Sequence, residues 1–362
     1  KVDLHHIHME DDAGKSIHDE SDSTLIDLNR AGSPLIEIVT EPCIKGPDEA
    51  ATFLQEVRRI VRYIGISEAN MEKGEFRCDA NISIMPIGSK ELGNKVEIKN
   101  MNSFSNVRRA ITYELGRQLD LRDLNDPVIV ETRTFDPNTG ITASMRMKET
   151  MNDYRYFPCP DLSPLIIEEG YIAERRAEMG VTPHQMRTLF KKEYQLSDYD
   201  VILLTDEKET ALYFKTLCVL VDSAKSAANW MNGAVRGLLN ELNLDIRSLA
   251  ITPERLADLI GLVDSGQLNA NVATQRVLPE MTKSLQGALE IAQANDLLSN
   301  EDSSTLDMLI REVLLSLPKE VEAFKNGKKK LMGLFMGEVM KKSGGKANPK
   351  AVQEKLKEQL SN

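Results

Sequence analysis

The chain has 362 residues, of which 41% are apolar and 28% are charged, and its formal net charge is −11. This composition is ordinary for a globular protein, and the length predicts two or three domains rather than one core. The acidic balance argues against a nucleic-acid binder that is basic over its whole surface. The apolar runs are too short for a membrane span, so we expect no membrane partner.

The cysteines and the first residues indicate the compartment. Four cysteines lie far apart without a CxxC pair, so neither a zinc site nor a disulfide framework is expected, and a reducing, bacterial cytoplasm fits best. The sequence begins KVDLHHIHME, without an initiator Met or the apolar core of a signal peptide. Because it enters a strand-like pattern at once, we expect a chain that lacks its N-terminal portion.

The first 165 residues or so alternate short strands, turns and two helices. The first predicted helix begins at Pro47, carries one apolar face through Ile64 and ends at Gly65. The second begins near Ser103, and its apolar positions include Val107, Ile111 and Leu115. These two helices interrupt a series of predicted strands.

The strands have one polar face. In FRCDANISI (76–84), apolar residues from Phe76 to Ile84 alternate with Arg77, Asp79, Asn81 and Ser83. KVEIKN adds the polar pair Glu97 and Lys99, and the next two predicted strands add Glu131, Arg133, Arg146 and Lys148. Any one such strand is typical of an antiparallel sheet with a solvated face. Repeated carboxylates and guanidinium groups together predict a polar floor that binds phosphate and metal.

After about Glu178 the pattern is almost entirely helical. We therefore predict an α+β protein with a mixed-sheet cradle domain (1–178), a helical domain (179–300) and a small helical tail domain (301–362). From about Leu306 the tail shows three predicted helices. The last begins at Asn348-Pro349 and repeats Val352, Leu356 and Leu360.

The end of the chain is basic. From Lys325 onward it contains ten lysines and three acidic residues. Such a run alone is commonly a solvated face or a disordered tail. Here a regular apolar pattern is interleaved with the lysines, so we expect a folded basic module that contacts a polyanion.

HMEDDAGK (8–15) places three carboxylates in succession, Glu10, Asp11 and Asp12. Adjacent carboxylates repel one another, so the arrangement suggests a bound cation. Mg²⁺ prefers carboxylate oxygens, which a loop carrying Glu10 and Asp11 and two strands carrying Asp79 and Glu97 would supply. From the spacing alone, a solvated acidic turn remains the alternative.

Four ordered motifs carry a family resemblance. The stretches IDLNRAGSPLIEIVTEP (26–42), FRCDANISI, EIKNMNSF (97–104) and DYRYFPCPDLSPL (153–165) closely resemble the B subunit of the tRNA-dependent amidotransferase family. The lysine-rich end is similar to the tail module of the same subunit. The resemblance covers essentially all 362 residues.

The resemblance implies a reaction and its cofactors. Glutamate or aspartate mischarged on tRNA is activated by ATP in the presence of Mg²⁺, and ammonia displaces the phosphate to give Gln-tRNA or Asn-tRNA. It also implies two partners in a heterotrimer, a glutaminase (A) subunit and a small C subunit. This chain shows no nucleophile with a nearby base, which agrees with glutamine hydrolysis in another subunit.

The resemblance also implies site residues. The catalytic and metal-binding set is Glu10, Asp11, Asp79 and Glu97. Asp11 stands where the family usually has glutamate, and its shorter side chain makes direct ligation less secure. The nucleotide-binding set is Lys15, Arg77, Asn81, Lys99 and Arg155. The charge of the basic module, rather than the resemblance, selects the tRNA-binding set, which is Lys328, Lys329, Lys330, Lys341, Lys342 and Lys346.

Two other functions remain open at this stage. In a non-catalytic tRNA-binding adapter the acidic cluster would be structural, and binding would need no ATP-dependent modification of tRNA. A metal-dependent phosphohydrolase would release phosphate without tRNA.

Overall fold

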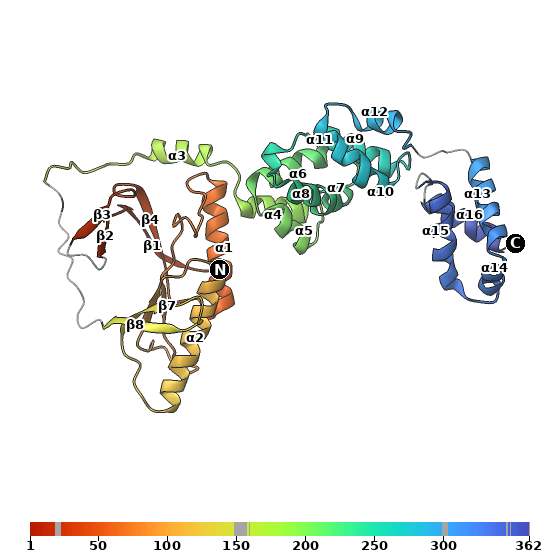
Figure 1. Cartoon of the computed structure of the whole chain (residues 1–362). Helices are drawn as coiled ribbons and strands as arrows, with labels where there is room; N and C mark the ends of the chain where they lie inside the picture. The colour runs from red at the N-terminus through yellow and green to blue at the C-terminus, as the bar shows by residue number, and fades with distance from the viewer. Residues whose placement is uncertain are drawn as a thin grey trace. The chain divides into compact units, whose positions relative to one another are not determined.

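The computed structural model describes residues 1–18, 23–147, 158, 160–298, 303–344, 347 and 349–361. The chain divides into two compact units, Lys1–Gly180 and Val181–Asn362 (Figure 1). The first unit combines strands with helices and the second is helical, which confirms the predicted α+β class. The further division predicted between residues 300 and 301 stays a prediction.

The described residues of the first unit form three sheets. Two of them are antiparallel pairs, in which β1 joins β4 and β2 joins β3. The third has the order β5-β6-β7-β8, with β6 and β7 parallel and the other neighbours antiparallel, so it is a mixed sheet. The strands are β1 (Leu4–Asp11), β2 (Lys15–His18), β3 (Thr24–Asp27), β4 (Pro34–Thr40), β5 (Ala80–Ile82), β6 (Val96–Lys99), β7 (Glu131–Phe135) and β8 (Thr142–Met147).

Both predicted helices of this unit are confirmed. α1 (Pro47–Tyr63) begins at the predicted proline, and Gly65 follows its end with φ +76°, a left-handed conformation that glycine adopts without strain. α2 (Phe104–Asp123) begins after Ser103, whose side chain accepts a hydrogen bond of 3.1 Å from the Asn106 backbone N–H. A third helix, α3 (Glu169–Glu178), closes the unit without a buried residue.

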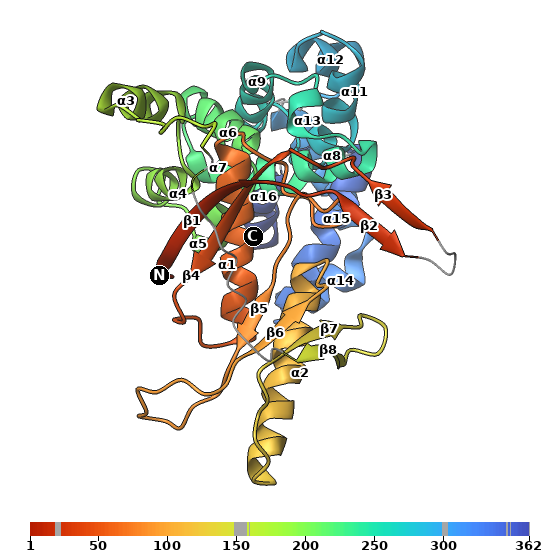
Figure 2. The ribbon, with the colours of Figure 1, turned by 90° about the vertical axis from the view of Figure 1, so that its left-hand side faces the viewer.

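The core of the first unit lies between the mixed sheet and the two long helices (Figure 2). Ile82, Ile98 and Phe135 of the sheet are buried with Val107 and Ile111 of α2. The alternation predicted for FRCDANISI holds along 76–82 but ends there, because β5 stops at Ile82. The opposite face of β5 and β6 therefore presents polar side chains.

The prediction for Glu131 and Arg133 was wrong. Thr132 is paired with Glu97, and Arg133 is paired with the buried Ile98. Paired residues on neighbouring strands lie on the same face of the sheet, so the polar face of β7 carries threonines. Arg133 lies instead on the core side, where it pairs with Glu131 at 2.7 Å and with Glu114 of α2 at 3.8 Å. These two strand residues thus belong to a buried ion-pair network. The side chain of Arg146 and all of Lys148 lie outside the described residues.

The second unit is built from helices (Figure 1). Its tail has four described α-helices rather than the predicted three, because a break before Pro318 separates α13 from α14. The predicted stripe on α16 is confirmed, since Val352, Leu356 and Leu360 are buried in one cluster with Phe335. The helices are α4 (Pro183–Lys192), α5 (Asp198–Leu204), α6 (Lys208–Leu220), α7 (Ala224–Trp230), α8 (Arg236–Leu242), α9 (Pro253–Asp264), α10 (Ala270–Val272), α11 (Leu278–Lys283), α12 (Ala288–Ala294), α13 (Ser303–Ser316), α14 (Pro318–Lys325), α15 (Met332–Lys342) and α16 (Pro349–Ser361).

Candidate functional site on the polar face of the mixed sheet

Two carboxylates and one ammonium group meet on the polar face of β5 and β6. The Lys99 Nζ lies 2.6 Å from Asp79 Oδ2 and 3.5 Å from Glu97 Oε1. Burial acts to lower the pKa of Lys99, but the hydrogen bond and charge of Asp79 and the charge of Glu97 outweigh it and raise that pKa. Asn81 lies directly opposite Glu97 in the strand pairing. Four of the predicted residues therefore share one face.

Thr132 on β7, the strand parallel to β6, forms a hydrogen bond with Glu97. Its Oγ1 donates a hydrogen bond of 2.9 Å to Glu97 Oε2, and the residue is 1% exposed. The Glu97 carboxylate is thus held by Thr132 on one side and by Lys99 on the other. The sequence analysis chose Glu131 and Arg133 of β7 for the polar face. Thr132 could have been chosen only by assigning the opposite set of alternating residues in β7 to that face.

Asp12 connects the acidic motif to the segment before β5. Its Oδ2 accepts a hydrogen bond of 2.7 Å from Arg77 and lies 3.0 Å from Arg30 Nε. Arg30 also donates to the Gly74 carbonyl at 2.6 Å. The hydrogen bond from Arg77 outweighs burial and lowers the pKa of Asp12, with the charges of both arginines adding to the effect. No role was predicted for Asp12 or Arg30, although Asp12 is the third carboxylate of HMEDDAGK.

The prediction that Glu10 and Asp11 lie in a loop was wrong. They are the last two residues of β1. Consecutive strand residues face opposite sides, and both side chains are exposed. Within the described ranges, no three His, Cys, Asp or Glu side chains are grouped closely enough to hold a metal ion. The metal site made of Glu10, Asp11, Asp79 and Glu97 therefore stays a prediction.

The donor chemistry of Asp79 and Glu97 nevertheless suits Mg²⁺. Both supply carboxylate oxygens, and the Asp79 side chain is 47% exposed, so it is open to a ligand. The neighbouring Cys78 is not an alternative nucleophile, because burial and then the Asp79 charge raise its pKa to about 12. Of the remaining predicted nucleotide ligands, Lys15 is exposed at the start of β2, and Arg155 lies outside the described residues.

The predicted tRNA-binding lysines differ in their surroundings. Lys328, Lys330 and Lys341 are exposed. The Lys329 Nζ lies 4.7 Å from the centre of the Phe324 ring, and Lys342 pairs with Glu312. Lys346 lies outside the described residues. Lys329 and Lys342 are exposed too, so Lys328, Lys330 and Lys341 are distinguished by positive charge that no ring or carboxylate of the described residues contacts.

Comparisons with known proteins assign the chain to a family. A profile described as the GatB/GatE catalytic domain matches residues 1–173, and one described as the GatB domain matches residues 212–360. The B subunit of the aspartyl/glutamyl-tRNA(Asn/Gln) amidotransferase from Thermodesulfovibrio yellowstonii is 45% identical over 354 residues, covering 98% of this chain and 74% of the relative. The chain belongs to this family.

Further relatives in this amidotransferase family agree. The corresponding B subunit from Acaryochloris marina is 43% identical over 366 residues, with 99% of this chain and 74% of the relative covered. That from Chlorobium limicola is 44% identical over 359 residues, with 99% and 75% covered. The resemblance seen in the motifs is thereby confirmed.

The two family matches cover different predicted sites. The segment matched to the catalytic domain contains Asp12, Asp79, Glu97 and Lys99, and the second segment contains most of the basic end of the chain.

Among the helices that the structure describes, none combines the length and the apolar character needed to cross a membrane.

Proposed function

We propose that this chain is the amidotransferase subunit that converts misacylated Glu-tRNA(Gln) or Asp-tRNA(Asn) to Gln-tRNA(Gln) or Asn-tRNA(Asn) at the expense of ATP. The observation that carries the proposal is the match to amidotransferase relatives over 98–99% of the chain. The match to a domain named as catalytic, over residues 1–173, disfavours a non-catalytic adapter.

The reaction requires activation of a carboxylate, which is a poor electrophile because its oxide does not leave. One oxygen of the side-chain carboxylate attacks the γ-phosphorus of ATP, and ADP leaves with the electrons of the broken P–O bond. Ammonia then attacks the carbonyl carbon of the acyl phosphate. Inorganic phosphate departs with the former carboxylate oxygen, and the amide nitrogen loses a proton.

The polar face supplies charges for these steps. Lys99 and Arg77 place positive charge beside the site, where it stabilises the charge of the transferred phosphoryl group. Asp79 and Glu97 would hold Mg²⁺, which when bound neutralises phosphate charge. Thr132 orients Glu97, and Asp12 anchors the Arg77 side chain. Lys15, Asn81 and Arg155 are proposed to contact the nucleotide.

The proposal includes partners. A glutaminase (A) subunit supplies ammonia, a small C subunit completes the heterotrimer, and the basic tail binds the tRNA body. Lysine is a point charge that positions a phosphate backbone without reading bases, so amino-acid discrimination falls to the first unit.

Separate assays of the two steps test the proposal. Asp79→Ala should abolish γ-phosphate transfer to misacylated tRNA and leave tRNA affinity within about twofold, because the tail is unchanged. Asp123→Ala, an exposed position on α2, is the matched control. Phosphate transfer by Asp79→Ala at the rate of the control, or tRNA-independent phosphate release, would contradict the proposal.

A further inference from the structure

The turn before β5 is held by an arginine from a distant part of the chain. Arg30 Nη1 donates a hydrogen bond of 2.6 Å to the Gly74 carbonyl, 44 positions away. Gly74 has a φ of +69°, and a Cβ atom at this position would lie 2.8 Å from Arg30 Nη1. Any other residue would therefore strain the backbone and crowd the arginine, so the contact depends on glycine.

The turn is also closed by its own hydrogen bonds. The Gly74 backbone N–H donates to the Met71 carbonyl at 3.1 Å, and the Glu75 N–H donates to the Asn70 carbonyl at 2.9 Å. The Glu75 side chain accepts a hydrogen bond of 3.1 Å from the Asn70 backbone N–H in return. Arg30 therefore binds a carbonyl group whose direction is already fixed.

Arg30 and Arg77 share one carboxylate oxygen. Asp12 Oδ2 lies 3.0 Å from Arg30 Nε and 2.7 Å from Arg77 Nη2. The Asp12 backbone pairs with the residues that follow Arg30, because its N–H donates to the Ser33 carbonyl and its carbonyl accepts from the Gly32 N–H, each at 2.8 Å. Arg30 thus reaches Arg77 by two routes, through Asp12 and through the turn that ends three residues before Arg77.

Arg77 is the group that these contacts place. Its side chain is 58% exposed, and in the alternation of 76–82 it lies on the same face as Asp79, which pairs with Lys99 at 2.6 Å. A guanidinium group has five N–H donors, so the contact with Asp12 leaves donors for phosphate oxygens. An arginine held in one position in this way meets a phosphate without reorganising.

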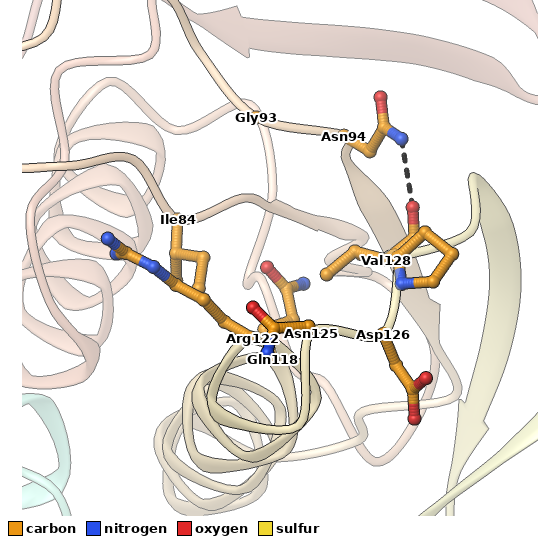
Figure 3. A pocket seen from close by; sticks show the side chains of 9 residues that line it. Ile84, Gly93, Asn94, Gln118, Arg122, Asn125, Asp126 and Val128 are labelled. Carbon is orange, nitrogen blue, oxygen red and sulfur yellow. Dashed lines mark hydrogen bonds between the residues drawn. The ribbon is translucent and has the colours of Figure 1, made fainter.

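The other end of β5 is held by different contacts. The Asn94 side chain donates a hydrogen bond of 2.8 Å to the Val128 carbonyl, which ties the loop after β5 to the turn that follows α2 (Figure 3). At Gly93 a Cβ atom would lie 2.3 Å from the Ile84 carbonyl oxygen, so only glycine permits this close approach of the two backbones. Loss of Arg30 should therefore release the segment before β5 without displacing the loop after it.

We infer that Arg30 is a positioning residue for phosphoryl transfer. It fixes the Arg77 guanidinium through Asp12 and through the Gly74 carbonyl. Its own Nε and Nη1 are engaged by these two partners, so it acts on the phosphate through Arg77 and not by direct contact. The inference rests on the proposed function, in which Arg77 stabilises the transferred phosphoryl group.

A double-mutant cycle tests the inference. Single-turnover phosphate transfer and the calorimetric affinity for a non-hydrolysable ATP analogue are measured on this chain with the two proposed partner subunits. Arg77→Gln should lower both about tenfold or more, because it removes a charged hydrogen-bond donor. Arg30→Gln should lower both about fivefold and leave tRNA affinity within about twofold. The double variant should match Arg77→Gln alone within about twofold, because Arg30 acts only through Arg77.

Two further variants support the cycle. Arg122→Gln is the matched control, since it removes an exposed arginine near the far end of β5 and should change neither quantity (Figure 3). Gly74→Ala should reproduce the loss in Arg30→Gln, because the added methyl group displaces the same contact. It replaces Arg30→Gln in the cycle if that variant does not fold.

Three results would overturn the inference. These are an Arg77→Gln variant that behaves as the control, an Arg30→Gln variant that does so, or losses that multiply in the double variant, as a direct phosphate contact of Arg30 predicts. A parent complex that binds the ATP analogue but transfers no phosphate would contradict the proposed function instead. The affinity cycle would then still decide whether Arg30 positions Arg77.

Discussion

Glu114 of α2 belongs to a buried ion-pair network, so its loss should destabilise the first unit. Its carboxylate is fully buried and accepts two hydrogen bonds from Arg117, at 2.7 and 2.9 Å. Arg133 lies 3.8 Å away, and Glu131 pairs with both arginines, at 2.7 and 3.6 Å. The two negative charges of Glu114 and Glu131 are therefore matched by the two positive charges of Arg117 and Arg133.

Glu114→Gln keeps the shape of the side chain and removes one negative charge. The network is left with a net positive charge, and breaking a buried ion pair in this way costs about 3–5 kcal/mol. The Arg117 side chain is 20% exposed, so water relieves part of the imbalance. We therefore expect the lower end of the range, about 3 kcal/mol of unfolding free energy.

Urea unfolding followed by two probes measures this loss. For a unit of this size the dependence of the unfolding free energy on urea is about 2 kcal/mol per M, so the midpoint should fall by about 1.5 M. Far-ultraviolet circular dichroism should report that shift. Fluorescence of the one tryptophan, Trp230, should not, because this residue lies in the second unit.

The exposed Asp123→Asn is the control and should change stability by less than about 0.5 kcal/mol. If Glu114→Gln shifts the midpoint no more than this control, the network does not stabilise the fold. If both probes shift together, the effect is not confined to the first unit.

Three further predictions concern the site, the acidic motif and the tail. Thr132→Val should slow single-turnover phosphate transfer about fivefold while Thr132→Ser stays near the parent rate, since one hydrogen bond is worth about 1 kcal/mol. Equal rates in the two variants would show that this hydrogen bond does not contribute to transfer. The pKa of Asp12 is lowered in the folded chain, so its stabilisation is present above its ordinary pKa and is lost as the pH falls through the lowered value. In Asp12→Asn the unfolding temperature should therefore fall less steeply as the pH is lowered below the ordinary pKa of aspartate. The same pH dependence in the variant and the parent would argue against the Arg77 contact. Replacing Lys328, Lys330 and Lys341 by Gln should weaken tRNA binding and reduce the slope of log affinity against log salt, by roughly 0.9 per lost duplex phosphate contact; the same slope before and after would make these lysines a solvated face.

Much of the local structure could be predicted from the sequence because it depends on neighbouring residues. The proline at the start of α1, the cap at Ser103 and the stripe on α16 each involve residues within a few turns of one another. The polar face at Asp79 and Glu97 could likewise be predicted from a period of two.

Contacts between distant segments could not be predicted in this way. Glu131 and Arg133 have the alternation of a solvated strand, yet their charges are matched by α2 across the sheet. The alternation of polar residues along a strand does not show whether a charged side chain is exposed to water or forms a buried ion pair. Asp12 meets Arg77 across 65 positions, which no local spacing indicates.

The fate of one oxygen atom tests the proposed function most directly. Glutamate labelled with ¹⁸O in its side-chain carboxylate is charged onto tRNA(Gln) and incubated with this chain, the two proposed partner subunits, ATP, Mg²⁺ and glutamine. Activation by phosphorylation predicts one ¹⁸O in the inorganic phosphate for each Gln-tRNA(Gln) formed, and loss of both products in Asp79→Ala. Gln-tRNA(Gln) formed with phosphate that carries no ¹⁸O would contradict the account.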